Sequence, residues 1–463
     1  MSIHKNEKST ILIFAKRALL QNGWAENVRL IVQQGVITTI APQSKASPAD
    51  VTVDTLLPAL SNLHSHSFQR AMAGMTEFRA SGHDSFWTWR DLMYRFVNRI
   101  TPDQMQAIAA LVFMEMQEAG YAAVGEFHYV HHQKGGAPYE DIAELSNQIY
   151  AAAKSTGIGL THLPVLYTYG GAGEAPMAEG QLRFGNNIDR YLKLLERARD
   201  GLKYLHEDAR IGMAPHSLRA TSPAVLEAAL AHHKTGPIHI HIAEQPKEVA
   251  DIQAWLGLRP VEWLLQNIDV NSNWCLIHAT HMTHEETMRM AKVGAVAGLC
   301  PITEANLGDG PFNGPSYLIA DGAFGVGSDS NVNISLTEEL RTLEYSQRLR
   351  DMARNVFVVG EGSVGATLYR GAARGGAQAL GRNAGEIAEG KLADLVAINS
   401  TTPALCALKS DQLLDGLVFA AKDSVVTDVW SAGRHSVKNG HHIDREGITK
   451  NYRSAITQLL ATV

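Results

Sequence analysis

Two histidines, His64 and His66, end an apolar segment that begins at Leu57. Residues i and i+2 of an extended segment point to the same side, so both imidazoles can reach one ion. A His-x-His pair alone is weak support for a metal site, because two histidines often share a strand face by chance. The pair becomes informative only if other segments bring further ligands to the same place.

Three later apolar segments also end in side chains that can bind a metal or move a proton. These side chains are, in chain order, His241 with Glu244 after it, His278, and Asp329. Burying several titratable groups is costly unless they are paired or bound to a metal. The convergence therefore predicts a metal centre held by His64, His66, His241 and Asp329.

Three imidazole nitrogens and one carboxylate oxygen suit a single Zn²⁺ with an open position for water, and Fe²⁺ or Mn²⁺ also fits these ligands. Zinc lowers the pKa of its bound water to about 7, which provides a nucleophile near neutral pH. We expect Glu244 to shuttle protons, and Asp329 to accept one from the water. We expect His278 to act as an electrostatic and acid–base group, with a role as a fourth histidine ligand left open.

The elements that must position these side chains alternate between apolar strand-like runs and amphipathic helical runs. Eight such strands predict an α/β fold, a parallel (β/α)8 TIM barrel, whose active site lies at the C-terminal ends of the strands. A doubly wound open sheet is the structural alternative. The expected strands are Leu57–His64, Tyr121–Tyr129, Gly159–Leu166, Arg210–Ala214, Ile238–Ala243, Trp274–His278, Ala295–Leu299 and Ala323–Gly327.

Both ends of the chain show short strands with tight turns, at Gln34-Gly35, at Gly433 and at Asn439-Gly440. Neither end is long enough to form a core alone, so we expect the two to combine in one flanking β-sandwich. The expected division is a β-sandwich from residues 1–57 and 385–445, a metal-dependent barrel at 58–384, and a C-terminal helix at 446–463.

The composition of the 463 residues, 45% hydrophobic with a net charge of −6, is that of a globular protein with a sizeable core. It offers no basic field for a nucleic acid and no lysine-rich stripe for a membrane surface. No apolar run reaches the roughly 18 residues of a membrane span, and we expect no signal peptide. The cysteines, Cys275, Cys300 and Cys406, do not suggest a disulfide framework, which favours the cytoplasm.

Among the 20 histidines, several are expected to be unrelated to the metal centre. His239 shares a strand face with His241 but lies deeper in the barrel, so we expect it to be a packed structural residue. The adjacent pairs are expected at the surface: His131-His132, His232-His233 and His441-His442.

The arrangement of these strand-end residues resembles the amidohydrolase superfamily, and the segment from His241 to Glu244 looks like its deaminase branch. Ala214-Pro215-His216 stands where a lysine would end the fourth strand, so a binuclear centre built on a carboxylated lysine is not expected. Four segments are similar to the formimidoylglutamate deiminase family of histidine degradation: Asn62–Gly74, Phe86–Arg90, Ala214–Arg219 and Gly327–Asn331.

This resemblance implies hydrolysis of N-formimidoyl-L-glutamate to N-formyl-L-glutamate and ammonia, by a homodimer. Arginine binds carboxylates bidentately and stays charged, which suits a substrate with two carboxylates. The implied substrate contacts are Gln69, Arg90, Tyr129, His216 and Arg219.

Two other functions remain open. A deaminase of the same branch that acts on a purine, a pterin or a related heterocycle would need stacking aromatic residues and amide groups, without paired arginines. A barrel that has lost catalysis and serves in assembly or binding would lack a metal ligand or Glu244, and all of these are present.

Overall fold

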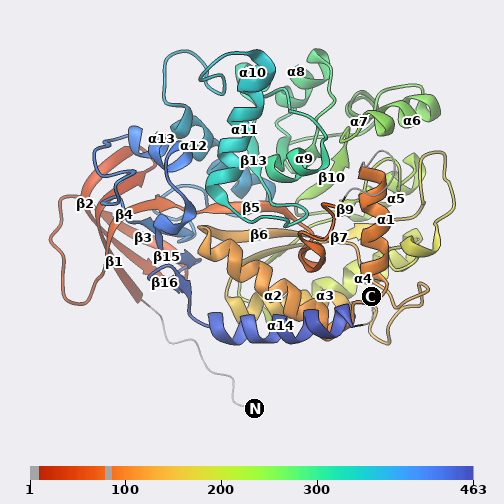
Figure 1. Ribbon diagram of the computed structural model, residues 1–463, viewed down its shortest axis with the longest axis horizontal. Coiled ribbons are helices and arrows are strands. Elements are labelled where there is room, and N and C mark those ends of the chain that lie inside the picture. The colour runs from red at the N-terminus through yellow and green to blue at the C-terminus, as the bar shows by residue number, and fades with distance from the viewer. Residues whose placement is uncertain (1–9, 79–85, 462–463) are drawn as a thin grey trace.

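Two sheets of parallel strands lie at the centre of the molecule (Figure 1). The computed structural model describes residues 10–78 and 86–461. All residues of the two longest barrel strands, Tyr121–His128 and Gly159–Leu166, are buried, as expected where helices cover one face of a parallel sheet and side chains fill the inside of the barrel. The barrel strands are β5 (Leu60–Ser65), β6 (Tyr121–His128), β7 (Gly159–Leu166), β8 (Arg210–Ile211) with β9 (Ala214–Pro215), β10 (Ile238–Ile242), β11 (Trp274–His278), β12 (Val296–Leu299) and β13 (Phe324–Val326).

These two sheets close into a ring through two isolated parallel bridges. Met213 pairs with Ile238, which joins the interrupted fourth strand, β8 and β9, to β10. Ser65 pairs with Asp329, which joins the end of β5 to the segment after β13. Because both gaps are closed, the prediction of a (β/α)8 barrel is confirmed and the open-sheet alternative is excluded.

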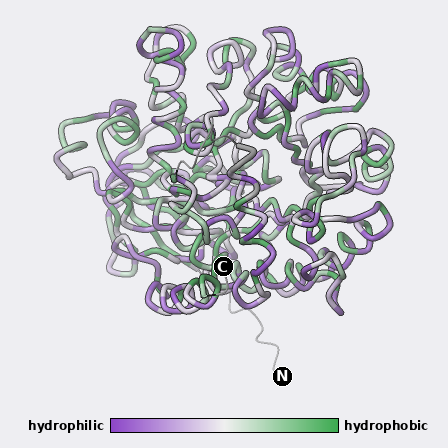
Figure 2. The backbone as a smooth tube through the Cα atoms, turned by 45° about the vertical axis from the view of Figure 1, so that its right-hand side comes forward, coloured by the Kyte–Doolittle hydropathy of each residue, from purple (hydrophilic) through white to green (hydrophobic). Residues whose placement is uncertain are grey.

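Helices surround the barrel, and Figure 2 shows hydrophilic and hydrophobic residues alternating along them, as expected for helices that bury one face. Figure 1 also shows α14 lying along α2. The helices are α1 (Phe86–Val97), α2 (Pro102–Glu118), α3 (Glu144–Thr156), α4 (Ile188–Gly201), α5 (Pro223–His232), α6 (Pro246–Leu256), α7 (Pro260–Asn267), α8 (His284–Lys292), α9 (Pro301–Leu307), α10 (Gly314–Ile319), α11 (Leu336–Asp351), α12 (Val364–Ala379), α13 (Gln412–Phe419) and α14 (Arg445–Leu460).

Strands from both chain ends share one eight-stranded sheet beside the barrel, as the sequence predicts. The central strand β4 pairs in parallel with β1 and antiparallel with β14, so it joins the two ends. In order across the sheet, the strands are β17 (His441–His442), β16 (Arg434–Lys438), β15 (Val426–Ser431), β14 (Leu395–Ile398), β4 (Val51–Pro58), β1 (Thr10–Leu20), β2 (Gly23–Gln33) and β3 (Val36–Ala41).

Three hairpin turns in this sheet have the same backbone form. Both central residues of each turn have positive φ, for example 51° at Gln34 and 80° at Gly35, or 52° at Asn439 and 78° at Gly440. Such turns match the twist of the adjoining strands, and Asn-Gly is the typical sequence for them. The turn signals in the sequence therefore indicate the hairpins correctly.

The first expected strand, Leu57–His64, spans two elements rather than one. β4 ends at Pro58 in the end sheet, and β5 begins at Leu60 in the barrel. The apolar run is continuous because both strands are buried here, so hydrophobicity alone does not mark the change.

A buried ion-pair network ties the end sheet to the N-terminal side of the barrel strands. Arg382 Nη2 lies 3.0 Å from Asp208 Oδ2 and 2.9 Å from Asp394 Oδ2. Arg434, on β16, lies 2.7 Å from Asp208 Oδ1. Because Asp208 precedes β8, this network is at the opposite end of the barrel from the strand C-termini, where stability rather than chemistry is expected.

Two further expectations concern helices and histidines. No helix within residues 10–78 and 86–461 is long and apolar enough to cross a membrane.

The expectation of surface histidines is wrong for His131, His132 and His442, which are buried. Their ring nitrogens bond, respectively, to Val165 O, Asn186 Oδ1 and Thr156 O.

Candidate metal centre and adjoining cavity

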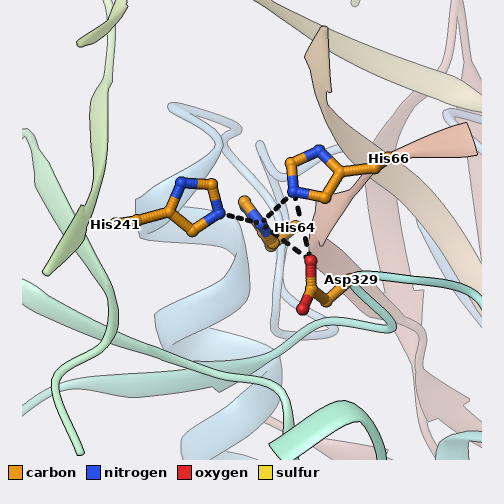
Figure 3. Close-up of side chains that lie close together, drawn as sticks. All are labelled: His64, His66, His241 and Asp329. Atoms are coloured by element: carbon orange, nitrogen blue, oxygen red, sulfur yellow. Dashed lines mark hydrogen bonds and ion pairs between the residues drawn. The ribbon is translucent and has the colours of Figure 1, made fainter. Parts of the chain in front are cut away.

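Three histidines and one aspartate converge at the C-terminal ends of β5, β10 and β13 (Figure 3). His64 Nε2 lies 3.2 Å from His66 Nε2 and 3.1 Å from His241 Nε2. Asp329 Oδ1 lies 3.3 Å from His64 Nε2 and 3.2 Å from His66 Nε2. All four residues are buried, and their ligand atoms lie within 4.8 Å of one another, so this group could hold a metal ion.

The outward-facing nitrogens of two of these rings bond to backbone carbonyls. His66 Nδ1 donates to Phe127 O at 2.9 Å, and His241 Nδ1 donates to His216 O at 3.1 Å. Donation from Nδ1 leaves a lone pair on each Nε2, which is the arrangement that orients histidine ligands in metal sites. Lone pairs and a carboxylate oxygen that converge in this way fit a bound cation.

The protonation states also suit a cation. Burial and the neighbouring imidazoles lower the pKa of His64 to about 3, with the Asp329 carboxylate acting in the opposite direction. Burial opposes ionisation of Asp329, but the adjoining imidazoles of His64 and His66 outweigh it and hold the pKa of Asp329 well below its usual value. Neutral imidazoles and an ionised carboxylate are the forms that bind a metal.

Asp329 is fixed relative to His64 by close contact between the first and last barrel strands. The Asp329 N–H donates to His64 O at 3.0 Å, and the His66 N–H donates to Asp329 O at 2.9 Å. Gly327 permits this approach, since a Cβ there would lie 2.7 Å from both His64 N and His64 O. Asp329 itself has φ of 45°, a conformation that the surrounding bonds must enforce.

A side-chain network holds the same junction. Asn62 Nδ2 donates to Ser328 Oγ at 2.7 Å, and Ser328 Oγ donates to Asn331 Oδ1 at 2.6 Å. Asn331 Nδ2 in turn donates to Ser65 Oγ at 3.2 Å. These residues explain why the segments around Asn62 and Asn331 are rich in small polar side chains.

Glu244 and His278 face one another beside the cluster. Glu244 Oε1 lies 3.8 Å from His278 Nε2, and Glu244 Oε2 lies 3.7 Å from Arg219 Nη2. Burial raises the pKa of Glu244. Burial opposes protonation of His278, but Glu244, Glu304 and Asp329 outweigh it and raise its pKa to about 10.

A cavity of about 60 Å³ opens over this group. It is lined by every residue expected to contact substrate, namely Gln69, Arg90, Tyr129, His216 and Arg219, together with His66, His241, Glu244, His278 and Asp329. Gln69 Nε2 donates to Tyr129 OH at 2.8 Å, which fixes both side chains. His64 is not among the residues that line the cavity. His239 is buried, and its Nε2 is bonded to Ala379 O at 2.7 Å, as expected for a structural residue.

Further cavity residues were not singled out from the sequence. They are Met93, Tyr94, Tyr167, Phe184 and Leu307, with Trp89 from a quoted segment. Tyr167 directly follows β7, so the strand-end rule could have found it. The α1 residues Trp89, Met93 and Tyr94, together with the predicted Arg90, repeat at helical spacing. The side chains of Phe86, Trp87 and Thr88 lie outside the described part of the chain.

Comparison with known proteins agrees with this geometry. The profile of the amidohydrolase family matches residues 55–435. The chain belongs to the amidohydrolase family. Residues 10–52 match a second profile, the N-terminal domain of formimidoylglutamate deiminase HutF, which places this amidohydrolase among the proteins of that type.

Individual relatives extend the comparison. A formimidoylglutamate deiminase from Pseudomonas aeruginosa is 49% identical over 97% of this chain and 99% of its own. A 5-methylthioadenosine/S-adenosylhomocysteine deaminase from Shouchella clausii is 27% identical over 99% of both chains. The crystal structure of an amidohydrolase from Brucella melitensis superposes with a TM-score of 0.93, at 47% identity, over 97% of this chain and 100% of that one.

Proposed function

We propose that this amidohydrolase hydrolyses N-formimidoyl-L-glutamate to N-formyl-L-glutamate and ammonia, a reaction of histidine degradation. The observation that carries the proposal is the presence of Arg90 and Arg219 in the same cavity as the histidine–aspartate cluster. The name of the 49%-identical Pseudomonas relative, formimidoylglutamate deiminase, supports the same substrate.

The two arginines would bind the substrate carboxylates. Burial opposes the charge on Arg219, but Glu248 and Glu244 outweigh burial and raise its pKa, so the guanidinium stays charged. Gln69 and Tyr129, already bonded to one another, would add hydrogen bonds. His216, whose pKa burial and Arg219 hold well below its usual value, would contribute as a neutral ring.

We infer that the metal ion is zinc, held by His64, His66, His241 and Asp329, with iron or manganese as alternatives that the same donors accept. Bound zinc would lower the pKa of a coordinated water to about 7. These four residues suit a metal ion because of the converging Nε2 lone pairs and the ionised carboxylate described above.

The proton transfers would be carried out by the chain's own acids. Hydrolysis of the amidine moves both protons of the water to the terminal nitrogen, which then leaves as ammonia. Asp329 and Glu244 would accept these protons, and Glu244 would deliver them. His278, 3.8 Å from Glu244, would stabilise the charge that develops and assist in protonating the nitrogen.

We further propose a homodimer in the cytoplasm. The resemblance to formimidoylglutamate deiminases supports the dimer. The three free cysteines, of which Cys406 is exposed, favour a reducing compartment. The partner in the reaction is a small dicarboxylate, with no nucleic acid or membrane involved.

The experiment that tests this function is ammonia release from N-formimidoyl-L-glutamate by zinc-loaded enzyme, with a chelator-treated sample as control. We expect chelator-sensitive release and competitive inhibition by simple dicarboxylates. The aromatic residues in the cavity are those expected of a heterocycle deaminase, so purines and pterins belong in the same assay. Turnover of a heterocycle without turnover of the amidine would assign the protein to that alternative.

A further inference from the structure

A second group of possible metal ligands adjoins the first. His278, Cys300 and Asp329 are all buried, and one ligand atom of each lies within 4.8 Å of the others. The three residues end or follow the neighbouring parallel strands β11, β12 and β13. Parallel strands present the residues at their C-terminal ends to one region, so the grouping follows from the fold.

Asp329 offers a different oxygen to each group. Its Oδ1 lies 3.3 Å from His64 Nε2 and 3.2 Å from His66 Nε2. Its Oδ2 lies 4.0 Å from His278 Nε2. One carboxylate can therefore serve the first ion through Oδ1 and a second through Oδ2.

His278 is oriented for this second role by Glu304. His278 Nδ1 donates to Glu304 Oε1 at 3.3 Å, and the same oxygen accepts the Cys300 N–H at 2.9 Å. A carboxylate behind a histidine is the usual support of a metal-binding imidazole, because it leaves Nε2 free to coordinate. Glu304 thus orients one candidate ligand while it fixes the backbone of another.

One separation within the group, between His278 and Asp329, is close to that of a tetrahedral site. Zinc–ligand distances of about 2.0 to 2.3 Å place neighbouring ligand atoms roughly 3.3 to 3.8 Å apart. His278 Nε2 lies 4.0 Å from Asp329 Oδ2 and 3.8 Å from Glu244 Oε1. A shift of a few tenths of an ångström would bring His278 Nε2 and Asp329 Oδ2 to this separation, and the Cys300 thiol, within 4.8 Å of both, would have to move by up to about 1 Å.

We propose that His278, Cys300 and Asp329 form a second, inhibitory metal site for a thiophilic divalent cation such as Cd²⁺ or excess Zn²⁺. A thiolate ligand selects soft or borderline cations over Mg²⁺, Ca²⁺ or Mn²⁺. The proposal rests on the metal centre of the proposed function, because Asp329 belongs to both sites.

Occupation of this site would stop turnover rather than support it. The cation would take His278 Nε2 and Asp329 Oδ2, which face the proposed reaction, and would lie beside Glu244. His278, whose pKa the neighbouring carboxylates raise, and the buried Cys300 thiol must each release a proton to the solvent when they bind. This cost makes the second site weaker than the first, so inhibition is expected only at cation concentrations above those that fill the first site.

The test is a titration of Cd²⁺ into enzyme that already holds one zinc per chain. The exposed Cys406 is first replaced by serine to remove its thiol. Thiolate-to-cadmium ultraviolet absorption, zinc release and ammonia production are followed together. We expect one further cation per chain, a thiolate absorption band, loss of activity and no zinc release.

Cys300→Ser should abolish the band and raise the half-inhibitory Cd²⁺ concentration about tenfold or more. Cys275→Ser is the matched control, since Cys275 is equally buried on β11, and it should leave both readouts unchanged. Cys300→Ala, checked by circular dichroism, replaces the serine variant if the latter does not fold. A band or unchanged inhibition in the Cys300 variants, or zinc release that matches Cd²⁺ uptake, would overturn the proposal. Zinc content and ammonia release before the titration report separately on the proposed function.

Discussion

The carboxylate of Glu248 accepts the backbone N–H of Glu244, with 3.0 Å between Oε2 and N. Its Oε1 accepts the N–H of Ala243 at 3.2 Å, and its Oε2 also lies 4.0 Å from Arg219 Nε. Ala243 has φ of 52°, which needs such support in a residue with a Cβ. One buried side chain on the first turn of α6 therefore positions both the proposed proton shuttle and a proposed substrate clamp.

Glu248→Gln is expected to lower kcat and raise KM together. The amide keeps the size of the side chain but accepts through one oxygen only and turns an NH2 group toward a backbone donor. An unsatisfied buried polar group costs about 1 to 3 kcal/mol, and a loss of that size in transition-state stabilisation corresponds to about 5- to 160-fold in kcat/KM. Steady-state kinetics measure this, with Asp251→Asn on the same helix as a control. An unchanged kcat would show that Glu248 has no positioning role.

Glu244→Gln is expected to lower kcat by about 100- to 10,000-fold, because the amide cannot accept or deliver a proton. The bound metal should remain, since Glu244 is not among the four clustered ligand residues. Metal analysis and single-turnover ammonia release test the two parts separately. Near-normal turnover would remove Glu244 from the proton pathway.

Arg219→Lys is expected to raise KM for N-formimidoyl-L-glutamate about 10- to 100-fold, because lysine keeps the charge but loses the bidentate geometry. Inhibition by glutarate should weaken in parallel. Arg197→Lys, which changes an exposed arginine paired with Asp141, serves as the matched control. If neither KM nor inhibition changes, the substrate carboxylates do not bind at Arg219.

Gly327→Ala is expected to weaken metal binding and to lower the free energy of unfolding by about 1 to 3 kcal/mol. The added Cβ would lie 2.7 Å from backbone atoms of His64, so β5 and the segment after β13 must separate. Gly171→Ala is the control, because its Cβ would have no neighbour closer than Ala175 Cβ at 3.7 Å. Urea denaturation and zinc titration of both variants provide the measurements, and equal behaviour of the two would contradict the predicted clash.

Asp208→Asn is expected to destabilise the protein at neutral pH, and less so in acid. Burial opposes ionisation of Asp208, but Arg434 and Arg382 outweigh it and lower its pKa from 3.8 to about 2. A lowered carboxyl pKa adds stability that is present above the unfolded-state value and is lost as pH falls through the folded-state value.

The Asp208→Asn variant should therefore lose about 2 to 5 kcal/mol at pH 7, and the difference from the unmodified protein should shrink between about pH 4 and pH 2. Urea midpoints measured across this pH range test the prediction. A difference that stays constant down to pH 2 would argue against an ionised Asp208 as its source.

The sequence predicts much of this site because the chemistry lies at strand ends. His241, His278 and Asp329 each close or follow a short apolar run, and the barrel brings such ends together. Tyr94 and Met93 were missed because they come from α1, an added helix between the first barrel strand, β5, and α2 rather than a strand end. Helix periodicity shows which residues share a face but not what that face contacts.

Other features could not be predicted because they depend on tertiary contacts. The fourth strand consists of two pieces of two residues each, β8 and β9, and the pairing of Met213 with Ile238 completes it. The burial of His131 and His132 likewise depends on Arg183, whose backbone carbonyl accepts both of their N–H groups. Neither case leaves a local pattern in the chain.

The position of β4 between strands from both chain ends has a consequence for synthesis on the ribosome. Residues 55–58 pair with residues 395–398, which are translated more than 300 residues later. At about 5 to 20 residues per second, one edge of β4 stays without its neighbour for roughly 15 to 70 seconds. An unpaired apolar edge invites association with other nascent chains, so this interval is when aggregation is most expected and a chaperone most useful.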